Sequence, residues 1–192
     1  MNGKLIIFSA PSGTGKTTIV RYLMRLGLPL EFSISATSRR KRENEQDGKD
    51  YYFFTSEIFK EKIANNEFLE WEEVYPNQFY GTLFSEIDRI FANNHHVLFD
   101  VDVVGGLNIK KKYLNNSLTI FLMPPSMDAL RERLRMRGTE TEESLRKREA
   151  KASLELSYKD EFDAIIINDD LETAKNRAYR IVKDFLFNNN DK

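Results

Sequence analysis

A glycine-rich segment that ends in Lys-Thr is the part of the chain whose residues point most directly to a chemistry. Residues 9–18 read Ser-Ala-Pro-Ser-Gly-Thr-Gly-Lys-Thr-Thr, after the apolar run Leu5–Phe8 and before a helical pattern. A buried strand, a glycine-rich turn and Lys-Thr at the start of a helix form the pattern of a phosphate-binding loop. Backbone N–H groups of such a loop face an anion, and the helix dipole adds partial positive charge. The segment therefore predicts a nucleoside triphosphate site.

Two side chains of this loop have separate roles in the prediction. Lys16 can reach the outer phosphates, and the hydroxyl of Thr17 suits Mg2+. Ala10 stands where the strict pattern begins with glycine, and the alternative is a turn between a strand and a helix that binds nothing. The residues predicted to bind the triphosphate are Ala10, Pro11, Ser12, Gly13, Thr14, Gly15, Lys16, Thr17 and Thr18.

The composition limits the class of protein. The chain has 192 residues, a formal net charge of -1 and no cysteine. We expect one main core, no disulfide framework, and no overall positive field for nucleic acid or an anionic membrane. The first residues run directly into an apolar strand without a signal segment, and no apolar stretch approaches the roughly 20 residues of a membrane span. These features predict a soluble cytoplasmic protein.

Short apolar runs alternate with helical patterns along most of the chain. The runs are typical of strands buried on both faces of a parallel sheet, and they are Leu5–Phe8, Val97–Phe99, Leu118–Met123 and Ala164–Ile167. The helical patterns are Thr17–Leu26, Ser85–Ala92, Ser126–Arg137, Glu142–Leu156 and Leu171–Phe187. This alternation predicts a layered α/β domain with helices on both faces of the sheet.

The stretch from Phe32 to Tyr80 breaks this alternation. It is expected to contain strands at Phe32–Ala36, Tyr51–Phe54 and Phe68–Val74, with a helix near Ser56–Asn66. These elements predict a small mixed or antiparallel insertion after the first helix.

Four short motifs in and after this insertion carry a resemblance to a known family. They are Phe32-Ser33-Ile34-Ser35-Ala36-Thr37-Ser38-Arg39-Arg40-Lys41-Arg42, Asp47-Gly48-Lys49-Asp50-Tyr51-Tyr52-Phe53, Phe68-Leu69-Glu70-Trp71 and Phe79-Tyr80-Gly81-Thr82. With them the chain resembles guanylate kinases, the enzymes that phosphorylate GMP with ATP, from the phosphate-binding loop to Ile167-Asn168-Asp169-Asp170. The resemblance implies a P-loop NTPase-type three-layer α/β fold with a central parallel sheet, a small mixed α/β GMP-binding insertion and a helical lid.

The resemblance also implies a division of the chain into parts. The expected core nucleotide-binding domain comprises residues 1–31, 83–125 and 158–187, and the GMP-binding subdomain comprises 32–82. The lid with its flanking helices spans 126–157, and 188–192 form a polar tail.

The chemistry of guanine explains why the family places a carboxylate in its base pocket. Guanine presents N1–H and an exocyclic amine as adjacent donors, and a carboxylate accepts from both. By the resemblance, Glu70 has this role, Ser35 and Thr82 contact the base, and the arginines and tyrosines bind the dianionic phosphate. The residues expected to bind GMP are Ser35, Arg39, Arg42, Tyr51, Glu70, Tyr80, Thr82 and Asp102.

Two carboxylates close the apolar run at Val97–Phe99. Asp100 and Asp102 are two residues apart, so both point to the same face of the strand. The resemblance implies that Asp102 contacts GMP, whereas Thr17 and Asp100 hold Mg2+, Asp100 directly or through a water. The alternative for Asp100 is the N-cap of a following helix.

Arginines near Gly138 match the lid of the family. Arg137 and Arg148 correspond to residues that close over the phosphates, and Arg133 is a weaker candidate; the alternative is a basic, solvent-facing helix surface. The resemblance also places Asn168 near the adenine of ATP. The residues expected to take part in catalysis are Lys16, Arg42, Arg137 and Arg148.

Two other functions remain open at this point. One is a non-catalytic guanylate-kinase-like domain that grips phosphorylated protein partners, and the other is a different nucleoside monophosphate kinase, such as an adenylate kinase. The intact phosphate-binding loop argues against the first, and the combination of Ser35, Glu70 and Tyr80-Gly81-Thr82 argues against the second. The sequence leaves open the oligomeric state and the register of the chain at Asn77–Phe79.

Overall fold

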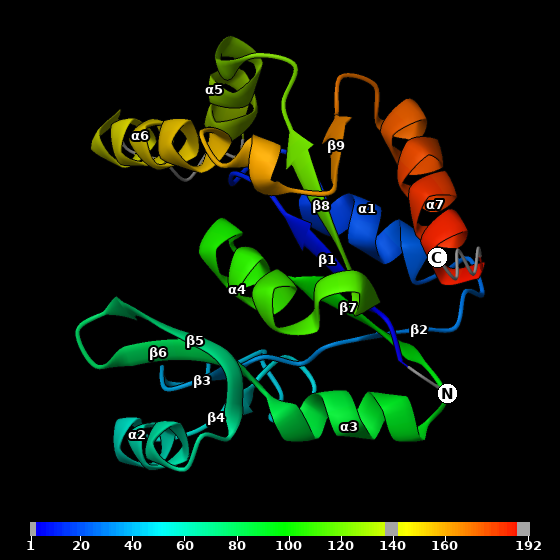
Figure 1. Ribbon diagram of the computed structural model, residues 1–192. Coiled ribbons are helices and arrows are strands. Elements are labelled where there is room, and N and C mark those ends of the chain that lie inside the picture. Colours follow the sequence, from blue (N-terminus) through cyan, green and yellow to red (C-terminus); the bar gives the residue numbers. More distant parts are fainter. Residues whose placement is uncertain (1–2, 137–141, 188–192) are drawn as a thin grey trace. The chain divides into compact units, whose positions relative to one another are not determined.

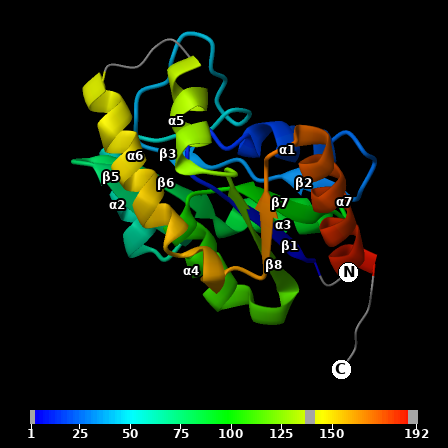
Figure 2. The ribbon, with the colours of Figure 1, turned by 90° about the horizontal axis from the view of Figure 1, so that it is seen from above.

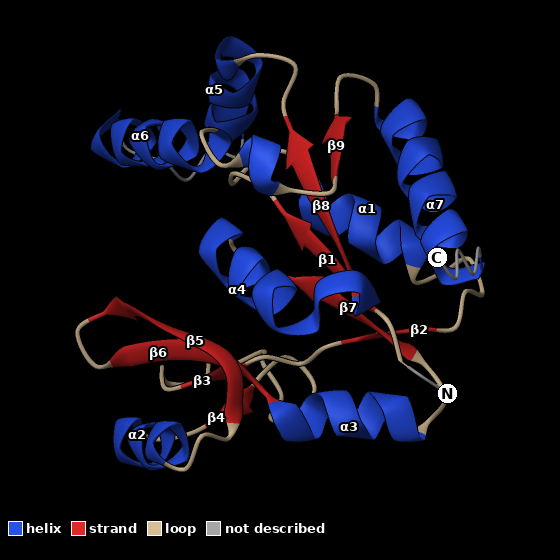
Figure 3. Ribbon diagram, in the orientation of Figure 1, coloured by secondary structure: helices blue, strands red, loops and turns tan. Residues whose placement is uncertain are grey.

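The computed structural model describes residues 3–136 and 142–187, apart from the side chain of Glu142. Helices and strands follow one another as shown in Figures 1 and 3. The strands are β1 (Leu5–Ser9), β2 (Leu30–Phe32), β3 (Ala36–Thr37), β4 (Tyr52–Phe53), β5 (Phe68–Tyr75), β6 (Gln78–Leu83), β7 (His96–Asp100), β8 (Ser117–Met123) and β9 (Ala164–Ile167). The helices are α1 (Lys16–Leu23), α2 (Ser56–Ala64), α3 (Phe84–Ala92), α4 (Val103–Tyr113), α5 (Met127–Met136), α6 (Glu142–Leu156) and α7 (Leu171–Phe187), with 3-10 turns at Leu114–Asn116 and Lys159–Glu161.

The chain forms two compact units. The larger unit comprises Lys4–Leu30 and the residues from Leu98 onward, and it contains the phosphate-binding loop. The smaller unit comprises Glu31–Val97 together with the start of the chain, and it contains the residues expected to bind GMP, apart from Asp102.

A sheet with the strand order β2-β7-β1-β8-β9 forms the centre of the fold. β1 pairs with β8 and β8 pairs with β9, each in parallel. All five residues of β1 are buried, as expected for a strand with both faces covered. The carboxyl ends of parallel strands meet at one edge of a sheet. The segment after β1 and the last residue of β7, Asp100, are expected to bind phosphate and metal.

Alternate residues of β8 face two different helical layers. Ile120 and Leu122 belong to a cluster with apolar residues of α1 and α7, which lie side by side in Figure 2. Phe121, between them in the sequence, packs instead with Val103 and Leu107 of α4. Because successive side chains of a strand point to opposite faces, this alternation produces a helix–sheet–helix arrangement in the larger unit.

Helix α4 was not expected from the sequence. Gly105 and Gly106 lie in its first turn, and glycine lowers helix propensity by roughly 1 kcal/mol each. Asp102 caps the start of this helix: its Oδ1 accepts a hydrogen bond of 2.7 Å from the backbone N–H of Gly105. An N-cap of this kind satisfies a backbone donor that the helix leaves unpaired.

Helices α5 and α6 pack on each other through a small apolar cluster. Leu130 and Leu134 of α5 meet Leu145 and Ala152 of α6. These helices contain Arg133 and Arg148, two of the predicted lid arginines, whereas Arg137 lies outside the described residues.

The smaller unit contains a mixed sheet with the strand order β4-β3-β6-β5. β3 and β4 are parallel, whereas β6 is antiparallel to both β3 and β5. Its core is aromatic: Phe59 of α2 stacks on Phe68 and Phe79, with ring centroids 4.3 and 5.4 Å apart. The mixed character agrees with the expectation for the insertion.

The expected strand at Phe32–Ala36 is wrong in one respect. The chain forms two short strands there, β2 and β3, which belong to different sheets. Residues 33–35, which belong to neither strand, thus connect the two sheets. Within the part of the chain that the structure describes, no helix is long and apolar enough to cross a membrane.

Candidate active site

The glycine-rich loop adopts a backbone that requires glycine at two positions. Gly13 and Gly15 have φ angles of 95° and 93°, a region that residues with a Cβ rarely occupy. The hydroxyl of Thr14 donates to the carbonyl of Pro11 at 2.9 Å and holds the turn from within. The loop therefore leads from the end of β1 into α1, which begins at Lys16.

Asn168 supports this loop from the end of β9. Its Nδ2 donates to the carbonyl of Thr14 at 2.6 Å, and the residue is buried. A Cβ at Gly15 would lie 2.6 Å from the same nitrogen, so the close approach of the two segments depends on glycine. Arg133, a candidate lid arginine, donates from Nη2 to the carbonyl of Asn168 at 2.9 Å. In this structure Asn168 and Arg133 thus stabilise the loop region.

Lys16, Thr17 and Asp100 meet at the start of α1. Lys16 Nζ lies 2.5 Å from Asp100 Oδ1 and donates to the carbonyl of Val101 at 2.7 Å. Thr17 Oγ1 donates to Asp100 Oδ2 at 3.3 Å. The side chains of Lys16 and Asp100 are 17% and 18% exposed, so their attraction is only partly screened by water. The structure thus brings together the residues predicted for phosphate and metal.

The two aspartates at the end of β7 differ in what they do. Asp100 faces Lys16 and Thr17, whereas Asp102 is the N-cap of α4. The alternative of an N-cap, considered for Asp100, therefore applies to Asp102 instead. The carbonyl of Asp102 also accepts from the hydroxyl of Ser9, which fixes the end of β7 to the end of β1.

Helix α6 contributes two charged residues to the candidate phosphate site of the larger unit. Nη1 of Arg148 donates to Oγ of Ser12 in the glycine-rich loop at 2.9 Å. Glu155 has a side chain that is 12% exposed, and burial raises its pKa. Asp102 adds to this rise, whereas Lys151 and Lys16 oppose it. A predicted lid arginine thus contacts the phosphate-binding loop directly.

In the smaller unit, Glu70 and Thr82 form a cross-strand pair. They are register partners on β5 and β6, and Thr82 Oγ1 donates to Glu70 Oε1 at 2.7 Å. Thr82 is fully buried and Glu70 is partly buried. The hydroxyl therefore fixes one carboxylate oxygen, which orients the acceptor pair. The register also answers the question at Asn77–Phe79: Tyr75 pairs with Gln78, so Asn77 lies in the hairpin turn.

Arg39 lies against the two tyrosines expected to bind phosphate. Its guanidinium carbon is 4.9 Å from the centroid of the Tyr51 ring, and the rings of Tyr51 and Tyr80 meet edge to face at 6.1 Å. Burial raises the pKa of Tyr51, so its hydroxyl stays a neutral donor. The structure thus gathers Arg39, Tyr51 and Tyr80 into one cluster of donors.

A carboxylate that the sequence analysis did not single out holds Arg39. Nη1 and Nη2 of Arg39 donate to the two oxygens of Glu45 at 2.6 and 2.5 Å, and the backbone N–H of Arg42 donates to Glu45 at 2.9 Å. These contacts raise the pKa of Arg39 above its usual range and lower the pKa of Glu45 to about 2. Glu45 lies three residues after Arg42 in the sequence, a spacing that could have indicated the turn in which the two residues contact each other.

Ser35 and Arg42 complete the positions expected for GMP. The carbonyl of Ser35 accepts from the backbone N–H of Tyr52 at 2.9 Å, which joins the segment before β3 to β4. Arg42 is exposed, and its charge contributes to the low pKa of Glu45.

Comparison with known proteins identifies the family. The sequence model of guanylate kinase matches residues 2–188 of the chain. The chain belongs to the guanylate kinase family. It is 55% identical over 183 residues to the guanylate kinase of Bacteroides fragilis, which covers 95% of this chain and 90% of that protein. It is 52% identical to the guanylate kinase of Bacteroides thetaiotaomicron, over 97% of this chain and 91% of the relative.

A solved structure supports the same conclusion. The crystal structure of guanylate kinase from Anaplasma phagocytophilum matches with a TM-score of 0.73 at 29% identity, covering 94% of this chain and 85% of that one. The resemblance read from the sequence and the predicted fold class are therefore confirmed.

Proposed function

We propose that this chain transfers the γ-phosphoryl group of ATP to GMP and releases ADP and GDP. The observation that carries the proposal is the pair formed by Glu70 and Thr82, in a guanylate kinase family chain that retains an intact phosphate-binding loop. A carboxylate with one oxygen fixed by a hydroxyl is complementary to N1–H and the amine of guanine. Adenine offers an acceptor at the N1 position, so it would place an acceptor against the partly buried Glu70 carboxylate.

GMP is held at both of its ends in this proposal. Glu70, Thr82 and Ser35 read the base, with Ser35 donating to guanine O6. Arg39, Tyr51 and Tyr80, which the structure brings together, bind the phosphate with Arg42. Asp102, the N-cap of α4, is the remaining residue that we propose to contact GMP.

ATP binds to the loop between β1 and α1. Residues 10–18 surround the phosphates with backbone N–H groups, as glycine-rich loops at helix N-termini do. Lys16 exchanges its contact with Asp100 for phosphate oxygens. Asn168 lies near the adenine, and its contact with Thr14 couples that end of the site to the loop.

The kinase reaction of this family needs a divalent metal, and we infer that it is Mg2+. Thr17 and Asp100 offer a hydroxyl and a carboxylate, the hard oxygen donors that Mg2+ prefers. No group of three or more His, Cys, Asp or Glu side chains suited to a metal occurs among the described residues. That fits an ion held by one or two protein ligands and the substrate phosphates. When bound, the ion neutralises charge on the phosphates.

Transfer itself requires positioning rather than proton chemistry. The acceptor oxygen belongs to the anionic phosphate of GMP, so no general base is needed. Lys16, Arg42, Arg137 and Arg148 neutralise charge on the migrating group. Closure of the lid excludes water, which would otherwise hydrolyse ATP.

An assay of ADP release tests the proposal. ATP and Mg2+ are supplied with GMP, AMP, CMP or UMP in parallel, and a chelator control removes the metal. We expect ADP only with GMP and only with metal. Binding of GMP without turnover would contradict the proposal and favour a non-catalytic domain, whereas turnover with AMP would contradict the assignment of Glu70. We further propose that the protein is cytoplasmic, because both nucleotides are available there.

A further inference from the structure

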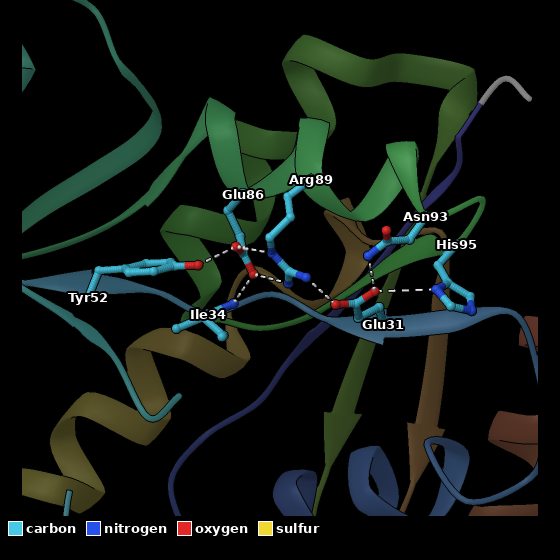
Figure 4. A network of polar contacts seen from close by, with 7 residues as sticks. All are labelled: Glu31, Ile34, Tyr52, Glu86, Arg89, Asn93 and His95. Carbon is cyan, nitrogen blue, oxygen red and sulfur yellow. Dashed lines mark hydrogen bonds and ion pairs between the residues drawn. The ribbon is translucent and has the colours of Figure 1, made fainter. Parts of the chain in front are cut away.

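A fully buried carboxylate lies at the centre of a polar network in the smaller unit. The side chain of Glu86, on α3, has no exposed surface. It accepts from the backbone N–H of Ile34 at 2.9 Å and from the hydroxyl of Tyr52 at 2.8 Å. Nε and Nη2 of Arg89 donate to its two oxygens, each at 2.9 Å. Figure 4 shows that these partners converge on the carboxylate from different segments of the chain.

The positive charge of Arg89 is shared between two carboxylates. Its Nη1 donates to Glu31, which also contacts Asn93 and the ring of His95 (Figure 4). The hydrogen bonds to Glu86 and then to Glu31 raise the pKa of Arg89. Arg89 thus places its positive charge directly against the buried Glu86 carboxylate, which offsets part of the cost of removing that carboxylate from water.

The partners of Glu86 lie next to residues proposed to bind GMP. Ile34 precedes Ser35, and Tyr52 follows Tyr51 and donates its backbone N–H to the carbonyl of Ser35. Glu86 itself lies four residues after Thr82, where β6 continues into α3. Three segments with GMP-binding residues are thus joined at one carboxylate.

We infer that Glu86, held by Arg89, is a positioning residue of the GMP site. It fixes the backbone at Ile34 and the ring of Tyr52, and through them the places of Ser35 and Tyr51. This inference rests on the proposed function. A loose Ser35 and Tyr51 would weaken GMP binding, because part of the binding free energy would be used to order them.

A matched ion pair in the larger unit provides the control. Asp163, before β9, accepts from the backbone N–H and the hydroxyl of Thr119 at 2.8 and 2.7 Å, and its other oxygen lies 2.7 Å from Lys110 Nζ. It therefore combines the same three kinds of partner as Glu86. Its partners Thr119 and Lys110 are not among the residues that we assign to either nucleotide.

The experiment compares Glu86→Gln and Asp163→Asn with the wild type. Steady-state kinetics give kcat and the KM for each nucleotide, and thermal unfolding gives Tm. We expect Glu86→Gln to raise the KM for GMP roughly fivefold to twentyfold, in line with the loss of charge-assisted hydrogen bonds. The KM for ATP should stay unchanged. Asp163→Asn should lower Tm without changing either KM.

The outcomes separate the inference from the proposed function. A lower Tm for Glu86→Gln with an unchanged KM for GMP would overturn the inference and leave a purely structural network. If that variant does not fold, Tyr52→Phe is used to test the inference, because it removes one hydrogen-bond donor to Glu86 and keeps the ring. A KM for GMP raised roughly twofold to threefold would support the inference. An unchanged KM for GMP would overturn it. A wild type that does not phosphorylate GMP would overturn the proposed function, and calorimetric GMP binding to the same variants would then test the inference.

Discussion

Arg39 and Glu45 form a bidentate ion pair in the smaller unit, with N–O distances of 2.6 and 2.5 Å. Glu45 thus presents two oxygens to the guanidinium, as a phosphate group would. Arg39 is also stacked on Tyr51. Glu45 therefore neutralises and orients the arginine that we propose for the phosphate of GMP.

This pair makes a contribution to stability that depends on pH. The folded-state pKa of Glu45 is about 2, below the value of about 4.3 for an unfolded glutamate. For a lowered pKa, the stabilisation is complete above the unfolded value and is lost as the pH falls toward the folded value. We expect wild type to be more stable than Glu45→Gln at pH 6, with a difference that shrinks toward pH 2.

Urea unfolding of both proteins at pH 6, 4 and 3 checks this expectation. Glu43→Gln is the control, because Glu43 is exposed and lies two residues before Glu45 in the sequence. A difference between wild type and Glu45→Gln that stays constant from pH 6 to pH 3 would contradict the ion pair.

Glu70 should control the choice of base. Replacing it with Gln keeps the size of the side chain but removes one of two acceptors, so either Thr82 or guanine loses its partner. We expect the KM for GMP to rise about tenfold to a hundredfold, the range for loss of a charge-assisted hydrogen bond. The preference for GMP over AMP should fall with it. Steady-state kinetics with both nucleotides give the result, and an unchanged preference would refute the role of Glu70.

The sequence predicted the parts of the fold that depend on local patterns. The loop between β1 and α1 could be identified because glycine, lysine and threonine have fixed positions in it. Helix α4 was missed because Gly105 and Gly106 lower its propensity, while the N-cap at Asp102 was assigned only to ligand binding. In this structure Asp102 stabilises the start of α4, in addition to the contact with GMP that we propose for it.

The supporting carboxylates could not be predicted for a different reason. Glu45 follows a basic run and reads as a solvated charge, and Glu86 lies in a helical pattern where glutamate is usually exposed. Their roles depend on partners up to 52 residues away in the sequence, such as Ile34 for Glu86. Only the folded chain brings those partners together.

Lys16 should contribute to the rate rather than to GMP binding. Lys16 pairs with Asp100, and in the reaction we propose that it neutralises charge on the transferred group. Loss of such a group costs roughly a hundredfold to a thousandfold in kcat. We expect Lys16→Met to show this loss with a nearly unchanged Kd for GMP. Lys147→Met is the control, since Lys147 pairs with Glu143 on an exposed helix surface where ion pairs contribute little.

Replacing Gly15 with alanine should reduce stability more than replacing Gly27, because a Cβ at Gly15 would collide with Asn168. Both have a positive φ, of 93° and 68°, so alanine at either position costs roughly 1–2 kcal/mol of backbone strain. Only at Gly15 does a Cβ meet a neighbour, Asn168 Nδ2 at 2.6 Å, whereas at Gly27 nothing lies within 4 Å. To accommodate Gly15→Ala, Asn168 must move and release the carbonyl of Thr14, which costs about 1 kcal/mol more.

The two alanine variants therefore separate strain from contact. Gly27→Ala should lose stability in urea and keep its affinity for ATP. Gly15→Ala should lose more stability and also bind ATP more weakly, because the loop it distorts is the one that we propose holds the phosphates. Its Kd for GMP should be unchanged. Equal stability losses and equal ATP affinities in the two variants would show that Asn168 does not support the loop.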